Sequence, residues 1–193
     1  MCWLGLKNIE PTNMQTYIAL LRGINVSGQK KIKMVELKES LESLSFSDVV
    51  TYIQSGNIIF KADEKSISKL ENKIHEKILK NFGFEVPILV KTPKELKHAI
   101  ANNPFQKKDD KYDPKLFAVV FLKEKPKAEN IAKLKTYDYS PEEYVLEDKI
   151  IYYYAANGAG NAKMNNNFFE NKLKVQATSR NWRTTHKLVE LSQ

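Results

Sequence analysis

The stretch Tyr17-Ile18-Ala19-Leu20-Leu21-Arg22-Gly23-Ile24-Asn25-Val26 determines how the first half of this 193-residue chain folds. Residues 17–21 form an unbroken apolar run, which is typical of a strand in the middle of a sheet. A polar loop with glycines follows the run. Apolar residues then recur at helical spacing, at Met34, Leu37, Leu41 and Leu44. The stretch therefore predicts a central strand, a long loop and an amphipathic helix, in that order.

The residues that follow extend this beginning into a complete unit. We expect strands at 49–53, 58–60 and 86–90 and a second amphipathic helix at 67–83. Gln54-Ser55-Gly56-Asn57 is typical of a hairpin turn, and Thr92-Pro93-Lys94-Glu95 is a capping box that predicts the start of a further helix. The order strand, helix, strand, strand, helix, strand is that of a ferredoxin-like (α/β-plait) unit.

The same order of elements recurs in the second half of the chain. We expect strands at 116–122, 144–146, 150–154 and 175–177 and helices near 131–134, 168–173 and 180–191. The sequence thus predicts an α+β protein of two tandem ferredoxin-like halves, with antiparallel sheets, helices packed on one face and a C-terminal helix. The predicted divisions are a leader at 1–15, halves at 16–102 and 116–193, and a polar linker at 103–115.

Charge is the most marked feature of the composition. The net charge is +8 and the pI is about 9.3, which permits binding to nucleic acid. However, 28 of the 31 basic residues are lysines, spread over the chain and mixed with 23 acidic residues, which favours general solubility. The three arginines, Arg22, Arg180 and Arg183, stand out because a guanidinium is a flat fork for carboxylate or phosphate.

Several classes of protein are disfavoured by the sequence. No apolar run approaches the roughly 18 residues of a membrane span, and the first residues lack the basic lead and apolar stretch of a signal peptide. A single cysteine, Cys2, excludes a disulfide framework and a cysteine-based metal site. His75, His98 and His186 lack metal-ligand spacing. We expect a cytoplasmic protein without metal or cofactor.

Three segments resemble a known family, the domain-of-unknown-function family numbered 1697. The segments are residues 17–26, Thr51-Tyr52-Ile53-Gln54-Ser55-Gly56-Asn57, and Thr178-Ser179-Arg180-Asn181-Trp182-Arg183-Thr184 with Lys187-Leu188. The resemblance covers residues 16 to 191. It implies a bacterial, cytoplasmic protein of two α/β-plait halves, and it implies no activity.

Candidate ligand-binding residues follow from the predicted topology. In a ferredoxin-like half the loop after the first strand and the turn after the second share one end of the sheet. Glycines there allow close approach of an anion. We expect one group of residues at that end of the first half and a second group at the start of the last helix: Arg22, Asn25, Lys31, Gln54 and Asn57, and then Arg180, Asn181 and Trp182.

Each group also has a purely structural interpretation. Glycine and asparagine serve left-handed turns, Asn181 is a suitable helix cap, and Trp182 is suited to anchoring a core. In the second half, the loop 155–161 with Gly158 and Gly160 is expected at the same sheet end as the final helix, facing Arg180.

The sequence leaves three functions open. The first is binding of a small anionic or phosphorylated molecule near Arg22, clamped by Arg180, with no catalytic residue assigned and enzymatic activity undecided. The second is RNA binding, for which Tyr152 and Tyr154 on one strand face provide aromatic rings; packing between the halves is the alternative use of these tyrosines. The third is a protein-interaction scaffold whose motifs hold the halves together.

Overall fold

The computed structural model describes residues 14–26, 28–107 and 111–193. Its first half runs through β1 (Gln15–Leu21), α1 (Met34–Glu42), β2 (Ser47–Tyr52), β3 (Asn57–Ala62), α2 (Ile67–Phe82) and β4 (Ile88–Lys91). The four strands form one antiparallel sheet in the order β2-β3-β1-β4. The apolar run 17–21 is the central strand, as predicted.

The second half repeats this arrangement. It contains β5 (Phe117–Leu122), α4 (Ala128–Leu134), β6 (Glu143–Glu147), β7 (Ile150–Tyr154), α5 (Asn166–Leu173) and β8 (Ala177–Asn181). The strand order β6-β7-β5-β8 matches that of the first half position by position. The predicted fold class of two similar α+β halves with antiparallel sheets is therefore confirmed, and the C-terminal helix is α6 (Trp182–Leu191).

Helix boundaries follow from local chemistry. The capping box is present at α3 (Pro93–Ala101), where Thr92 and Glu95 satisfy each other's backbone N–H groups. Ser66 caps α2, and Gly83 ends it in the left-handed conformation that glycine adopts without strain. These end points agree with the sequence prediction.

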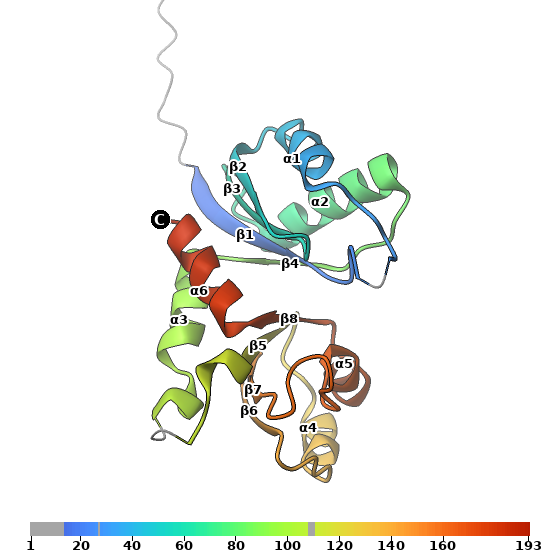
Figure 1. Cartoon of the computed structure of the whole chain (residues 1–193). Helices are drawn as coiled ribbons and strands as arrows, with labels where there is room; N and C mark the ends of the chain where they lie inside the picture. The colour runs from blue at the N-terminus through green and yellow to red at the C-terminus, as the bar shows by residue number, and fades with distance from the viewer. Residues whose placement is uncertain (1–13, 27, 108–110) are drawn as a thin grey trace, which may run out of the picture.

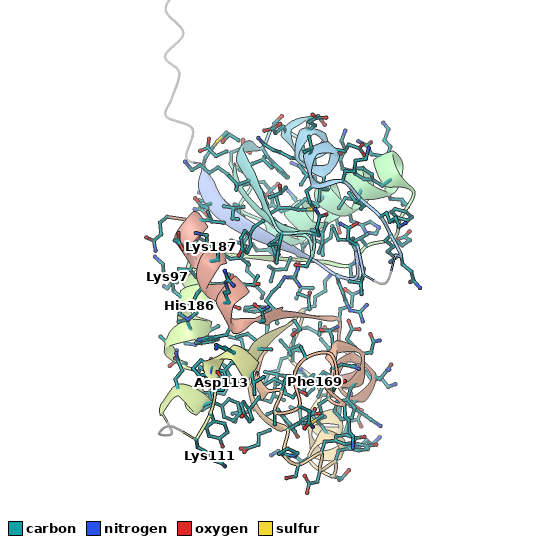
Figure 2. All side chains as sticks on the ribbon, viewed as in Figure 1. Lys97, Lys111, Asp113, Phe169, His186 and Lys187 are labelled. Atoms are coloured by element: carbon teal, nitrogen blue, oxygen red, sulfur yellow. The ribbon has the colours of Figure 1, made fainter. Side chains whose placement is uncertain are left out.

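The two sheets face each other across a shared core (Figure 1). Helices α1 and α2 cover the outer face of the first sheet, and α4 and α5 cover the outer face of the second; Phe169 of α5, labelled in Figure 2, is fully buried there. The inner faces turn toward each other, and α3 and α6 pack side by side between them. The shared core combines both halves and includes Ile18, Leu20, Ile59, Leu89, Phe117, Val119, Phe121, Tyr152, Trp182 and Leu188.

The structure differs from the sequence prediction at the last strand. We expected a strand at 175–177 and a helix from 180, but β8 extends to Asn181 and α6 begins at Trp182. The β-ladder explains the difference, because Arg180 pairs with Val119 and Asn181 with Ala118 of β5. Arg180 is thus a strand residue and not part of a helix terminus.

The segment between the halves contributes to the fold as well as connecting it. It contains 3-10 turns at Pro104–Lys107 and Pro114–Leu116, and Phe105 and Tyr112 are buried in the shared core. The predicted leader falls largely on residues 1–13, which lie outside the described part, and β1 starts at Gln15. Among the described helices, none is long and apolar enough to cross a membrane.

Candidate functional site

The loop after β1 and the turn after β2 meet at one end of the first sheet, as the topology predicts. Leu21, the last residue of β1, pairs with the first residue of β4, and Asn57 of β3 pairs with Leu20. Asn25 joins the two loops: its side-chain Nδ2 donates to the carbonyl of Gln54 at 2.9 Å. The same side chain also accepts from the backbone N–H of Ile32 and donates to its carbonyl. Asn25 therefore shapes the loop from within.

Gly56 fixes how closely the turn approaches the loop. Its φ is +77°, in the left-handed region, and a Cβ built on it would lie 2.6 Å from the Cβ of Leu21. No side chain fits that space. The glycine thus brings the carbonyl groups of the turn against the end of β1, where they become acceptors for a residue of the second half.

That residue is Arg180, which projects from β8 into the junction between the halves. Its Nε donates to Oδ1 of Asn57, and its Nη2 donates to the carbonyls of Leu21, Ser55 and Gly56. Its Nη1 donates to Oγ1 of Thr178 at 2.9 Å and to the carbonyl of Ser179 at 2.8 Å. All five N–H groups of the guanidinium are engaged.

The charge of Arg180 is not neutralised by an acid. The side chain is 7% exposed, every acceptor around it is neutral, and within the described residues no carboxylate lies at ion-pair distance. Burial lowers the pKa of Arg180 to about 10, which still leaves it protonated at neutral pH. A buried and unpaired cation raises the local positive potential at this junction.

Arg22 also bridges the halves, on the side facing solvent. It leaves the end of β1 and contacts Oδ1 of Asn167 and the carboxylate of Glu170, both on α5. Its Nε is buried and has no hydrogen-bonding partner within the described residues. Arg22 therefore retains donor capacity beside the junction.

Arg22 and Arg180 line the same cavity, which has a volume of about 500 Å³. The lining residues with polar side chains that matter here are Arg22, Gln29, Lys30, Asn166, Asn167 and Arg180. Three of them are cationic, and the residues that line the cavity include no acid. The cavity lies where the Arg22 loop of the first half meets α5 and β8 of the second. The structure thus brings segments that are about 145 residues apart in sequence to one cavity.

Asn166 and Asn167 also line the cavity and were not predicted from the sequence. Asn166 donates from Nδ2 to the carbonyl of Ala177 at 3.1 Å, which fixes the orientation of its amide, and its Oδ1 is buried without a partner within the described residues. The run Asn165-Asn166-Asn167 was the available clue, because three adjacent amides exceed the single one that capping α5 requires. Lys30, whose Nζ donates to the carbonyl of Glu85, also lines the cavity.

The other predicted site residues lie elsewhere or have structural roles. Lys31 is exposed and does not line the cavity, and Asn57 is fully buried as the acceptor for Arg180. Asn181 caps α6 by accepting from the N–H of Thr184 at 2.8 Å. Trp182 packs in the shared core, edge-on to Phe117 and to His186 of α6, which is labelled in Figure 2.

The strand tyrosines are part of the interior. Tyr152 is 1% exposed and Tyr154 packs against Phe105, Phe117 and Tyr112, so their packing between the halves is confirmed. A base cannot stack on Tyr152 in this structure. The loop 155–161 likewise does not contact the guanidinium of Arg180, whose partners all lie in β8 and the first half.

No described cluster of three or more histidine, cysteine, aspartate or glutamate side chains is arranged to hold a metal ion. The cavity at Arg22 is lined by cationic and amide groups, which are chemically suited to polar ligands. The residues that line this cavity include no histidine, cysteine or carboxylate to act as a base or nucleophile.

Comparison with known proteins gives a family and a fold. The family model described as "Protein of unknown function (DUF1697)" matches residues 14–152, which include two of the three resembling segments. A solved structure, described as conserved bacterial protein SP0830 from Streptococcus pneumoniae, superposes with a TM-score of 0.74. The two sequences are 23% identical, and the superposition covers 93% of this chain and 99% of the other. No curated protein matches the sequence.

Proposed function

We infer the function of this chain from its own residues, because the chain belongs to a family, DUF1697, that is described as being of unknown function. We propose that it binds a small anionic or phosphorylated molecule, of the size of a nucleotide or smaller, in the cavity at Arg22. The observation that carries the proposal is the charge of that cavity: Arg22, Lys30 and Arg180 line it, no acid among the described residues does, and Arg22 pairs with Glu170 just outside the lining. We also propose that the protein is cytoplasmic, as expected from its sequence.

The hydrogen bonds indicate a different role for each of the cationic residues in the site. Arg180 has no free N–H and supplies positive potential from behind the cavity wall, which an anion gains without a direct bond. Arg22, whose side chain is 26% exposed, and Lys30 supply the donors. Asn166 and Asn167 add amide groups to the same lining.

The sequence-based expectation of a direct clamp by Arg180 is therefore revised in this proposal. The alternative of a protein-interaction scaffold agrees with this proposal on one point, which is that Arg180 holds the two halves together. The RNA alternative relies on the lysine-rich surface alone, because Tyr152 is buried.

The proposal is tested by calorimetric titration with inorganic phosphate, ribose 5-phosphate, AMP and citrate at low and at physiological salt. We expect at least one of these anions to bind, with affinity that falls as salt screens the site. Lys30→Gln weakens that binding about 10- to 100-fold, because it removes a charged donor worth roughly 1.5–3 kcal/mol.

Lys31→Gln is the matched control, because Lys31 is adjacent in sequence and exposed outside the cavity. It removes the same charge from the chain and leaves binding within about twofold of the unmodified protein. Equal losses in the two variants, or no heat with any of the four anions, would show that the cavity at Arg22 is not an anion site.

A further inference from the structure

A second cavity adjoins the cavity at Arg22 along the junction of the halves. Its volume is about 370 Å³, within the range of small-molecule sites. One wall comes from α2 and from the segment 85–88 that leads into β4, and the other from Lys123, directly after β5, and Gln176, directly before β8. Arg22 and Lys30 line both cavities. The two cavities therefore meet at these two cationic residues.

Hydrogen bonds show how Arg22 reaches from one cavity to the other. Its backbone N–H donates to the carbonyl of Pro87 at 3.0 Å, and Pro87 lines the second cavity. Its guanidinium donates to Oδ1 of Asn167, which lines the cavity at Arg22. Lys30 donates from Nζ to the carbonyl of Glu85, another residue of the second cavity. The side chain of Arg22 is 26% exposed, so a ligand can reach the charge at this boundary.

The carboxylates that line the second cavity have basic side chains beside them. Glu71 lies 3.5 Å from Nζ of Lys123, and Glu85 lies 3.1 Å from Nε2 of His75. The lining residues that this cavity does not share with the first thus carry no excess of positive charge. A neutral polar group suits this lining better than a second anion, because the two carboxylates repel further negative charge.

Two exposed amide side chains complete the lining of the second cavity from opposite halves. Asn72 belongs to α2 of the first half, and Gln176 precedes β8 of the second. Both are exposed, and an amide offers donors and an acceptor to a hydroxyl or a ring nitrogen. The second cavity is therefore equipped to hold a polar, neutral group such as a sugar or a nucleobase.

We propose that the two cavities together bind a phosphodiester, whose phosphate lies at Arg22 and Lys30 and whose two substituents occupy one cavity each. The inference rests on the proposed anion site and names the class of its ligand. The phosphate and the first substituent are the nucleotide-sized part in the cavity at Arg22, and the second substituent extends into the second cavity. A dinucleoside monophosphate has this arrangement, and each cavity is large enough for one nucleoside.

Calorimetric titration of the whole chain with adenylyl-(3′→5′)-adenosine and with AMP tests this proposal. The dinucleoside monophosphate carries a single negative charge and AMP carries about two at pH 7.5, so charge alone favours AMP. We nevertheless expect the dinucleoside monophosphate to bind about 3- to 10-fold more tightly than AMP, because its second nucleoside gains hydrogen bonds in the second cavity.

The double variant Asn72→Ala/Gln176→Ala removes both amides from the second cavity. It is expected to abolish the preference for the dinucleoside monophosphate, while inorganic phosphate binds within about twofold of its affinity for the unmodified protein. The double variant Gln106→Ala/Asn171→Ala is the matched control, because it makes the same two exchanges at exposed residues that line neither cavity. It retains the preference, and unchanged thermal midpoints show that both variants are folded.

The proposal is overturned if AMP binds at least as tightly as the dinucleoside monophosphate, or if the preference survives the loss of both amides. A six-nucleotide adenylate that binds more than about tenfold more tightly than the dinucleoside monophosphate would overturn it in favour of single-stranded RNA, since each further phosphate contact adds affinity. If phosphate and AMP bind without this preference, the phosphodiester inference fails and the anion site stands. If no anion binds, both fail.

Discussion

Arg180 shows what a single residue type reveals in a lysine-rich chain. Arginine is rare in this chain, which made Arg22 and Arg180 stand out in the sequence, and the structure places both beside one cavity. The direction in which Arg180 points was not predictable, because strand and helix propensities do not fix where a β-ladder ends. The β5 partner extends β8 through Asn181. Since side chains alternate along a strand, the ladder then turns Arg180 toward the first half.

Replacing Arg180 with lysine is expected to lower the free energy of unfolding by about 2–4 kcal/mol. An ammonium group has three donors and no fork, so it leaves buried acceptors such as Asn57 Oδ1 unpaired. Urea unfolding measures the change. Arg183→Lys, an identical substitution at an exposed residue of α6, stays within about 0.5 kcal/mol. Equal stability of the two variants would refute the role of the Arg180 fork.

At the scale of elements, the sequence predicted most strands and helices within a few residues, because their apolar periodicity and caps are local. What it missed are side chains whose role depends on a neighbour distant in sequence. Glu142, which precedes β6, is an example: it is 4% exposed and accepts from the hydroxyl of Tyr153 and from the backbone N–H groups of Lys163 and Met164. It therefore ties the segment before α5 to the second sheet.

Glu142 predicts a defined dependence of stability on pH. Burial by itself raises the pKa of this carboxyl, but the hydrogen bonds from Tyr153 and the two backbone N–H groups outweigh it and lower the pKa below its ordinary value of 4.5. A carboxyl whose pKa is lower in the folded state stabilises the fold fully above that ordinary value. The contribution is lost as pH falls through the lowered pKa.

Glu142→Gln is accordingly expected to cost about 1–3 kcal/mol at pH 7, because a charged acceptor is replaced by a neutral one. The difference from the unmodified protein shrinks when urea unfolding is repeated near pH 3. Glu124→Gln, at an exposed position, serves as the control. A difference that stays constant between the two pH values would contradict the assignment of this pH dependence to Glu142.

At the scale of the whole molecule, the repeat of two halves was predictable from the order of elements, but their mutual packing was not. The sequence of each half has the pattern of a complete unit. No local pattern predicts which faces of the two sheets pack against each other. The structure unites both inner faces in one core, closed by α3 and α6. Polar links reinforce it, among them Arg180 to the end of β1, Arg22 to Glu170, and Lys123 to Glu71 at 3.5 Å.

We therefore expect the two halves to unfold in one transition. In a Trp3→Phe background, the fluorescence of Trp182 reports the shared core, and hydrogen exchange at Leu20 and Leu89 reports the first sheet. Their free energies of opening agree within about 1 kcal/mol if the core is cooperative. A first half that stays protected after Trp182 has become exposed would show that the halves are independent.

The position of α6 has a consequence for how the protein is made. The ribosome releases the first half well before α6, and at ordinary rates of synthesis the delay is on the order of ten seconds. Throughout that time the inner face of the first sheet, with Ile18, Leu20, Ile59 and Leu89, is without α6 and the second sheet, which cover it in the folded protein. The nascent first sheet is then a ready client for a chaperone, and any nascent chain that stops short of residue 182 keeps that face open.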